Sequence, residues 1–472
     1  MTDTQEQTMV AYNPFELAGN SFDLEEASID HTAEFDKLVK ELKRAYCDAY
    51  MTSINYVVAC EEYVEYPRHT HGFPTEPRTI TRPTDDGEGG GTCTSAQTVG
   101  KTSFTTTFND LRKQIDAIVS SYRYFATGEE MEQACDHSNL WARSLHPYKQ
   151  ENDTAIPYWL ELIGHDLDKQ ESLTLDRVAA EMVGKIQPAL SYLQDATYAL
   201  TSLYVTTRHA LLITRSDVRK ALRSAISACD TYTNSRGTIS ILHTSSTILK
   251  ITNKVENLMK GDLTTIADSI DRIADWLTVD EEEDWFNYSL ILSPTGIINA
   301  LKNSLDEINT HLTSAETGIG SGFTKIADKL SECNDKGTIR IDNQSASSDK
   351  YSSNNIEINW TNLKNTYDHN LPHVAELLRE VKNEAYYTRY PSAFSHSSAI
   401  GLGTSGAWPK LVITLNSIQD CIERLAESCE GIAAGLRDFE ADTKATETES
   451  YEDLSKIRRT LDRYITVKPR FS

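Results

Sequence analysis

Two glycine-containing stretches of the chain could form phosphate-binding loops. Ser95–Thr102 reads Ser-Ala-Gln-Thr-Val-Gly-Lys-Thr, which differs at one position, Ser95 in place of the first glycine, from the loop whose amides and lysine cradle phosphates. Gly401–Gly406 matches the Gly-x-Gly-x-x-Gly dinucleotide fingerprint. Both motifs require an apolar strand before the loop, and neither stretch is preceded by such a pattern. We therefore expect a loop before a helix at the first, a turn between helices at the second, and no nucleotide cofactor.

Acidic and histidine clusters are the other candidates for chemistry. The run Asp280–Asp284 could attract calcium, but it lacks the alternating ligands and the central glycine of an EF-hand loop. The pairs His69/His71 and His369/His373 could bind a metal, although a proline breaks the helical spacing of the second pair. The chain has no Gly-x-Ser-x-Gly or comparable nucleophile motif. The sequence thus predicts no catalytic residue, no metal site and no cofactor, and we expect a protein that is not an enzyme.

The composition restricts the classes of partner. In 472 residues, 70 Asp and Glu against 46 Lys and Arg give a formal net charge of -24, which argues against nucleic acid or an anionic membrane as a partner. The first residues carry no basic or apolar segment of a signal peptide, and no run reaches the roughly 20 apolar residues of a membrane span. We expect a soluble, acidic protein that is cytoplasmic when made and inserts stably in no membrane. Any export would follow a route that needs no signal peptide.

The elements that must position any site are predicted to be long amphipathic helices. The clearest lies near the C-terminus, where apolar residues follow one another by steps of four and three: Leu411, Leu415, Ile418, Ile422, Leu425, Cys429, Ile432, Leu436 and Phe439. Charged residues fill the positions between them, so another helix must cover this apolar stripe. A helical period over 360–387 supplies a neighbour, and the Ser- and Gly-rich link ends at Pro409, which suits a first helical turn. Residues 355–465 therefore form a predicted C-terminal helical hairpin.

The same pattern predicts two further hairpins. Residues 24–135 form an N-terminal helical hairpin whose helices are separated by a Pro- and Gly-rich loop over 66–103, which we expect to be irregular and mobile. Residues 238–332 form a second hairpin with an acidic turn. Between the two, 173–232 is predicted to be a central long helical segment, kinked at Pro188.

Few segments of the sequence have the alternating pattern of a β-strand. Residues 338–342 and 355–359 alternate apolar and polar side chains around a Ser- and Asn-rich connector, which predicts a two-stranded ribbon. The predicted fold class is therefore all-α, with long antiparallel helical hairpins that form an elongated bundle and at most a minor β-ribbon.

The tryptophans are candidates for recognition, because two of them lie in turns between long helices. Each either closes the open end of a hairpin or anchors a partner protein. With the apolar stripe of the C-terminal helix they make up the candidate partner-binding residues: Trp285, Trp408, Leu411, Ile418, Leu425, Ile432 and Phe439.

The C-terminal hairpin resembles the helical hairpins exported by type VII secretion systems of actinobacteria, the Trp-x-Gly family and its larger relatives. The likeness rests on Trp408 and the glycines of Gly401–Gly406 in the turn, and on a second helix, Ile418–Thr446, that ends in a polar tail. The chain departs from the family at Lys410, where the family has glycine. The family's export signal, a tyrosine followed four residues later by an acid, is absent after this hairpin. The resemblance implies an exported helical protein that packs against a partner hairpin.

These observations lead to a functional hypothesis and two alternatives. The first is a non-enzymatic helical interaction protein, secreted by or associated with a type VII-like system, whose coiled-coil-like faces dock a protein partner through helix–helix packing. The second is a self-associating structural or scaffolding coiled-coil protein of a phage particle or cell envelope. The third is a helical pore-forming toxin, for which the apolar segments Leu411–Ile413 and Tyr288–Leu292 are short candidates for insertion.

Overall fold

The computed structural model describes most of the long helices of the chain. The described residues are 28–65, 78–84, 90–91, 102–126, 128–146, 156–170, 175, 178–180, 184–235, 239–244, 286–291, 293–335 and 358–446. Several sequence-level candidates lie outside them: the loop 95–101, His69 and His71, the run 280–284, Trp285 and the strand-like stretch 338–342.

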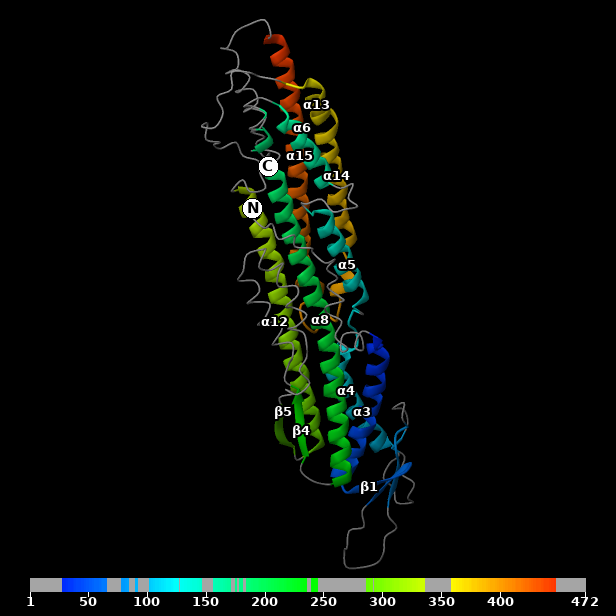
Figure 1. Ribbon diagram of the computed structural model, residues 1–472. Helices are drawn as coiled ribbons and strands as arrows, with labels where there is room; N and C mark the ends of the chain where they lie inside the picture. Colours follow the sequence, from blue (N-terminus) through cyan, green and yellow to red (C-terminus); the bar gives the residue numbers. More distant parts are fainter. Residues whose placement is uncertain are drawn as a thin grey trace, which may run out of the picture.

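Long helices lying side by side make up the body of the molecule, as the sequence predicts. The three longest are α8 (Gly184–Ser235), α12 (Pro294–Asp335) and α15 (Trp408–Thr446), and Figure 1 shows them running along one elongated bundle. At a rise of 1.5 Å per residue, the 52 residues of α8 span about 78 Å. The all-α fold class with minor β-structure is confirmed.

Shorter helices cover the flanks of these three. Next to α8 pack α3 (His31–Ser53) and α5 (Glu129–Ser144), and α14 (Leu371–Glu384) packs along α15. The described residues also form the shorter helices α4 (Thr102–Val119), α6 (Ile156–Asp168) and α13 (Trp360–Asn365). Apolar residues from the predicted hairpins and from the central helix meet in one continuous core.

The central helix α8 is unusual because residues 199–219 are buried without interruption. A helix buried on every face must satisfy its own polar side chains. Its threonines do so by hydrogen bonding to the carbonyl one turn earlier, as Thr201 does to Thr197 at 3.0 Å and Thr214 to Ala210 at 2.7 Å. The helix runs through Pro188 as one element. It therefore serves as the axis against which other helices dock.

The strands lie at other places than the sequence predicts. β1 (Tyr56–Ala59), β2 (Glu62–Glu65) and β3 (Thr79–Thr81) form an antiparallel sheet, so part of the expected irregular loop 66–103 is a strand. β3 is held because Ile80, fully buried, pairs with Tyr63. By contrast, Ile358 and Asn359 of the predicted ribbon are not in a strand, and Asn359 caps α13.

A second strand pair connects the two longest helices. β4 (Ile239–Thr244) follows α8, β5 (Phe286–Ile291) precedes α12, and the two pair antiparallel from Ile239 with Ile291 to Thr244 with Phe286. β4 contacts both α8 and α12. Figure 1 places this pair and the β1–β3 sheet toward the end of the bundle where α8 finishes.

Candidate functional site

The apolar stripe of α15, predicted to bind a partner, is internal, and this corrects the expectation of an exposed seam. Leu411, Ile418 and Leu425 have no exposed surface, and Ile432 and Phe439 are 5% and 4% exposed. The stripe is covered because α14, α12 and α8 all contact α15. The chain thus supplies its own packing partner for this helix, and these five side chains offer no surface for another protein.

Trp408 lies half-buried at the first turn of α15. Its ring is 5.8 Å from that of Phe394 in the preceding 3-10 turn η6 (Pro391–Phe394). It packs against the core from the open end of the α14–α15 hairpin, which is the geometry of a plug between two helices.

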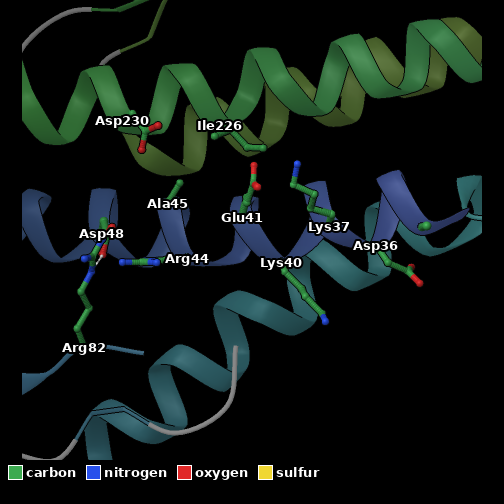
Figure 2. Close-up of a pocket in the computed structure, with 11 residues that line it drawn as sticks. Asp36, Lys37, Lys40, Glu41, Arg44, Ala45, Asp48, Arg82, Ile226 and Asp230 are labelled. Atoms are coloured by element: carbon green, nitrogen blue, oxygen red, sulfur yellow. Dashed lines mark hydrogen bonds and ion pairs between the residues drawn. The ribbon is translucent and has the colours of Figure 1, made fainter. Parts of the chain in front are cut away.

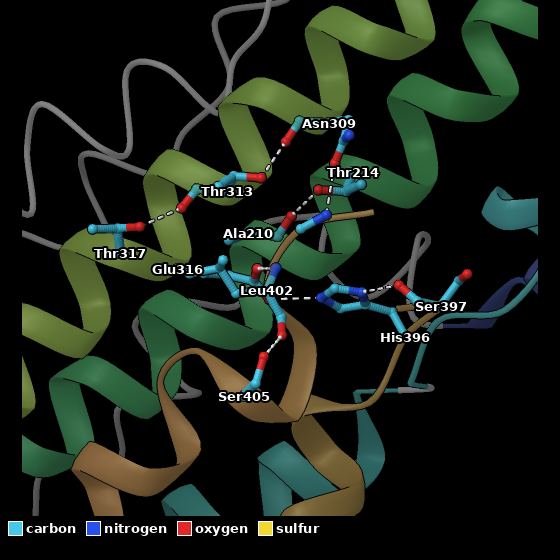
Figure 3. A network of polar contacts seen from close by, with 11 residues as sticks. Ala210, Thr214, Asn309, Thr313, Glu316, Thr317, His396, Ser397, Leu402 and Ser405 are labelled. Carbon is cyan, nitrogen blue, oxygen red and sulfur yellow. Dashed lines mark hydrogen bonds and ion pairs between the residues drawn. The ribbon is translucent and has the colours of Figure 1, made fainter. Parts of the chain in front are cut away.

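The glycine stretch before Trp408 is a loop folded onto α12, and Figure 3 shows the polar network that fixes it. His396 Nε2 lies 2.6 Å from Glu316 Oε1, and the Leu402 backbone amide donates to the other carboxylate oxygen. The Gly401 amide donates to Asn309 Oδ1 at 2.6 Å. The preceding residues form η6, a single β-bridge from His396 to Phe125, a turn and a bend, so no strand leads into Gly401 and the expected inter-helix turn is confirmed.

Gly401 is required by this geometry. Its φ of +54° lies in the left-handed region, and a Cβ built there would stand 2.6 Å from Glu316 Oε2 and 2.7 Å from His396 Cε1. The glycine therefore lets the backbone approach a buried ion pair, and no phosphate is needed to explain the motif.

His396 and Glu316 form a buried ion pair that no substrate can reach. Their side chains are 0% and 9% exposed. Burial alone would lower the pKa of His396, but the hydrogen bond and the charge of Glu316, with the Ser397 carbonyl at Nδ1, outweigh it and raise the pKa. Both ring nitrogens face oxygen acceptors, so the imidazolium fits the loop. The pair holds the loop in place and has no open face for catalysis.

A surface groove of about 660 Å³ runs along α3 (Figure 2). Side chains of both signs line it, including Lys37, Lys40, Glu41 and Asp230. At one end Asp48 accepts hydrogen bonds from Arg82 and from the Tyr63 hydroxyl, which ties the β1–β3 sheet to α3. Because the charges alternate in sign, the groove has no uniform field that would select an ion. Within the described residues, no group of three His, Cys, Asp or Glu side chains could hold a metal.

Of the second predicted histidine pair, His373 is used in packing and His369 is exposed. His373 lies with its ring 4.6 Å from Trp159 of α6 and its Nδ1 3.5 Å from Glu376. His369 belongs to the π-helical turn η4 (Thr366–Asn370), which departs from regular helical spacing.

An exposed aromatic patch is the surface feature that sequence reasoning missed. Tyr386 and Tyr387, in the turn η5 (Ala385–Thr388) after α14, are 72% and 57% exposed. Tyr387 lies 5.6 Å from the ring of His137 on α5, and Leu140, one turn further along α5, is 52% exposed. We call Tyr386, Tyr387, His137 and Leu140 the aromatic patch. Its sequence signal is a pair of adjacent aromatics directly after the last apolar position of a helix.

The patch stands on a rigid base. Tyr204 of α8, fully buried, donates its hydroxyl to the Thr388 carbonyl at 2.8 Å, which fixes η5 to the central helix. Arg389 places its guanidinium 5.5 Å from the centre of the Tyr386 ring. Its side-chain hydrogen bonds in the described structure go to the amide oxygens of Asn416 and Gln419 at 2.8 Å, and not to a carboxylate. The patch therefore combines exposed aromatic area with a cation for which the described residues show no carboxylate partner.

These features define the chain as an elongated all-α bundle in which other helices of the same chain cover the apolar stripe of α15. Comparison with protein-family models, with curated proteins and with solved structures gives no match.

Proposed function

We propose that this protein is a non-enzymatic helical interaction protein whose contact surface is the aromatic patch. Exposed tyrosines beside an arginine are the side chains that contribute most to protein–protein binding. The partner that fits is a helix or helical hairpin with an apolar stripe flanked by acidic residues. The stripe would cover Tyr387 and Leu140, and an acid would pair with Arg389.

The observation that supports this proposal is the contrast between the two apolar surfaces. The stripe of α15 is already covered by the chain itself, whereas Tyr386 remains 72% exposed on a turn that is anchored to the core. Ordered aromatic side chains lose little conformational entropy on binding. A partner would thus bind the patch without unpacking the bundle.

A photo-crosslinker at two matched positions tests the proposal. Tyr387 and Tyr124 are both 57% exposed, and Tyr124 lies outside the patch. With benzoylphenylalanine in place of each in the producing cell, we expect one defined adduct at 387 and none at 124. The identified adduct protein, once purified, should bind the unmodified chain and lose at least about tenfold in affinity for Tyr387→Ala but not for Tyr124→Ala. Equal adducts at both positions would rule out the patch, and an adduct with a second copy of the chain would favour the self-associating scaffold.

Export by a type VII-like route is part of the same proposal and rests on the resemblance of the α14–α15 hairpin. The half-buried Trp408 at the start of α15 supports it, because it occupies the place of the turn tryptophan in those hairpins. Intact protein in the medium of unlysed cells that carry such a system, and its loss when the secretion ATPase is deleted, is the expected result. Retention in those cells would contradict export and leave the patch proposal standing.

A membrane-active helical protein is a second candidate, favoured by the position of β5. Residues 288–291 of the segment Tyr288–Leu292, a candidate for insertion from its sequence, belong to the strand β5 near the end of the bundle. No helix among the described residues has the length and apolar character needed to cross a membrane. Any insertion would therefore need a rearrangement, and dye leakage from liposomes over a range of pH tests it. Liposomes that stay sealed at every pH would exclude this candidate.

A further inference from the structure

His31, the first residue of α3, is a buried histidine whose two ring nitrogens have different kinds of partner. Nε2 lies 3.0 Å from the Tyr122 carbonyl oxygen, and Nδ1 lies 3.2 Å from Arg219 Nη1 on α8. A carbonyl can only accept a hydrogen bond and a guanidinium can only donate one. Nε2 must therefore carry the proton and Nδ1 must accept, so the ring is neutral in this structure. The residue is 4% exposed, which leaves little water to solvate a charge.

The charges around His31 oppose a second proton. From α8, Arg219 contacts the ring and Arg215 donates to the Ile29 carbonyl at 2.6 Å, so two cations face the start of α3. On its own helix Asp30 is the nearby acid, and it caps the helix at the Ala33 amide.

The other described neighbours of His31 have hydrogen-bond partners of their own, and Glu34 also interacts with the charge of Arg219. Glu34 is paired with Arg223 at 2.9 Å. From the third side Tyr122 contributes its carbonyl, and the ring of Phe125 separates His31 from His396. The Tyr122 hydroxyl donates a hydrogen bond to the Leu305 carbonyl of α12.

We propose that His31 is an acid-sensitive latch, and that its protonation at Nδ1 breaks the contact with Arg219 and releases the first turn of α3 from α8. A protonated Nδ1 is a donor that faces another donor, so the contact turns from attractive to repulsive. Release would also weaken two contacts of the His31 ring, the hydrogen bond to the Tyr122 carbonyl and the packing against the Phe125 ring. The neighbouring amide of Ala126 holds the Ser395 carbonyl at 3.0 Å, so the effect would reach the loop on α12.

The pKa of His31 agrees with this geometry. Burial lowers it to about 4, the Tyr122 carbonyl and Asp30 oppose the shift, and Arg215 and Arg219 add to it. A neutral group with a lowered pKa stabilises the fold fully above the unfolded-state value of 6.5 and progressively less as the pH falls toward about 4. The latch is therefore closed at neutral pH and weakens in an acidic surrounding. It does not depend on which protein binds the aromatic patch.

Hydrogen exchange of the full chain at two pH values tests the latch. The shift from 6.5 to about 4 predicts that the opening constant of the first turn of α3 rises about 30-fold between about pH 7.4 and about pH 5, after correction for intrinsic exchange. His31→Gln keeps one acceptor for Arg219 and one donor for Tyr122 but does not titrate, so its exchange should not change with pH. The exposed His165→Gln should retain the full response of the unmodified chain.

Two results would overturn the proposal: no pH response in the unmodified chain, or the same response in His31→Gln. If His31→Gln does not fold, the pKa of the His31 ring in the unmodified chain tests the proposal instead. A titration of the His31 ring protons by NMR should give a value well below 6, and a value at or above the ordinary 6.5 would reject the latch.

Discussion

His31 and His396 both lie against the ring of Phe125, at centroid distances of 5.3 and 6.0 Å, and yet the structure gives them opposite protonation states. The hydrogen-bond partners of each ring determine its protonation state. His31 faces one donor and one acceptor and is neutral, whereas His396 faces the Glu316 carboxylate and the Ser397 carbonyl and fits as a cation. Burial favours the neutral form of both rings, so the difference comes from the hydrogen-bond partners and the nearby charges.

The stability conferred by His396 should decrease as the pH rises above the ordinary pKa of histidine. Its pKa is raised in the folded chain, so the contribution is fully present below the unfolded-state value of 6.5 and is lost as the pH rises through the folded-state pKa. The melting temperature of the unmodified chain should therefore fall over this range more than that of His396→Gln, which cannot titrate there. Parallel melting curves for the two chains would contradict the assigned ion pair.

Glycine substitutions should separate conformational constraint from helix propensity. Gly401→Ala forces a Cβ against Glu316 at a φ of +54°, and we expect a loss of about 1–3 kcal/mol in the free energy of unfolding. Gly164→Ala in α6 meets nothing within 4 Å and should instead stabilise by about 0.5–1 kcal/mol, because alanine favours the helix. Urea unfolding of both variants measures the two effects. If Gly401→Ala left the free energy of unfolding unchanged, the Glu316 and His396 side chains would not hold the loop as described.

The buried seam of α15 predicts a contrast between two apolar residues on one helix. Leu425 is fully buried, and Leu425→Ala should cost about 2–5 kcal/mol in the free energy of unfolding. Ile413 is 58% exposed, and Ile413→Ala should change it by less than about 0.5 kcal/mol. Sedimentation should show the same association state for both folded variants, because Leu425 is buried within the chain and Ile413 lies outside the aromatic patch. Dissociation of an assembly by Leu425→Ala alone, with the fold intact, would restore the seam as an interface.

The heptad spacing from Leu411 to Phe439 was enough to predict the long helix α15 and which of its faces is buried. The helical period over 360–387 predicted one neighbour, α14, but no pattern predicted that α12 and α8 cover the rest of that face. An apolar stripe has the same spacing whether its cover is α14 of the same chain or a helix of another protein, because the stripe records only the need for burial. The prediction of the helix was therefore confirmed, whereas the expectation that its apolar stripe is exposed to a partner was wrong.

The networks around the two histidines could not have been predicted from spacing. His31 and Arg219 are 188 residues apart, and His396 and Glu316 are 80 apart. Such contacts depend on how helices are placed in three dimensions, and no local pattern encodes that. The strand β3 was missed for the same reason, since its three residues form a strand only by pairing with β2.

Asp48 and Asp36 of α3 each pair with an arginine from another part of the chain, and the two pairs should differ greatly in their effect on stability. Asp48 is 5% exposed and accepts from Arg82 Nε at 2.9 Å and from the Tyr63 hydroxyl at 2.7 Å. Asp48→Ala would leave a largely buried guanidinium with only the Cys60 carbonyl as its acceptor, and a fully buried phenol without its acceptor. We expect a loss of about 3–5 kcal/mol and faster proteolysis of the β1–β3 sheet. Asp36 pairs with Arg123 through two contacts of 2.7 Å at the surface, where water solvates both charges, and Asp36→Ala should leave the unfolding midpoint nearly unchanged. Limited proteolysis beside urea unfolding measures both, and equal losses in the two variants would show that Asp48 does not anchor the sheet.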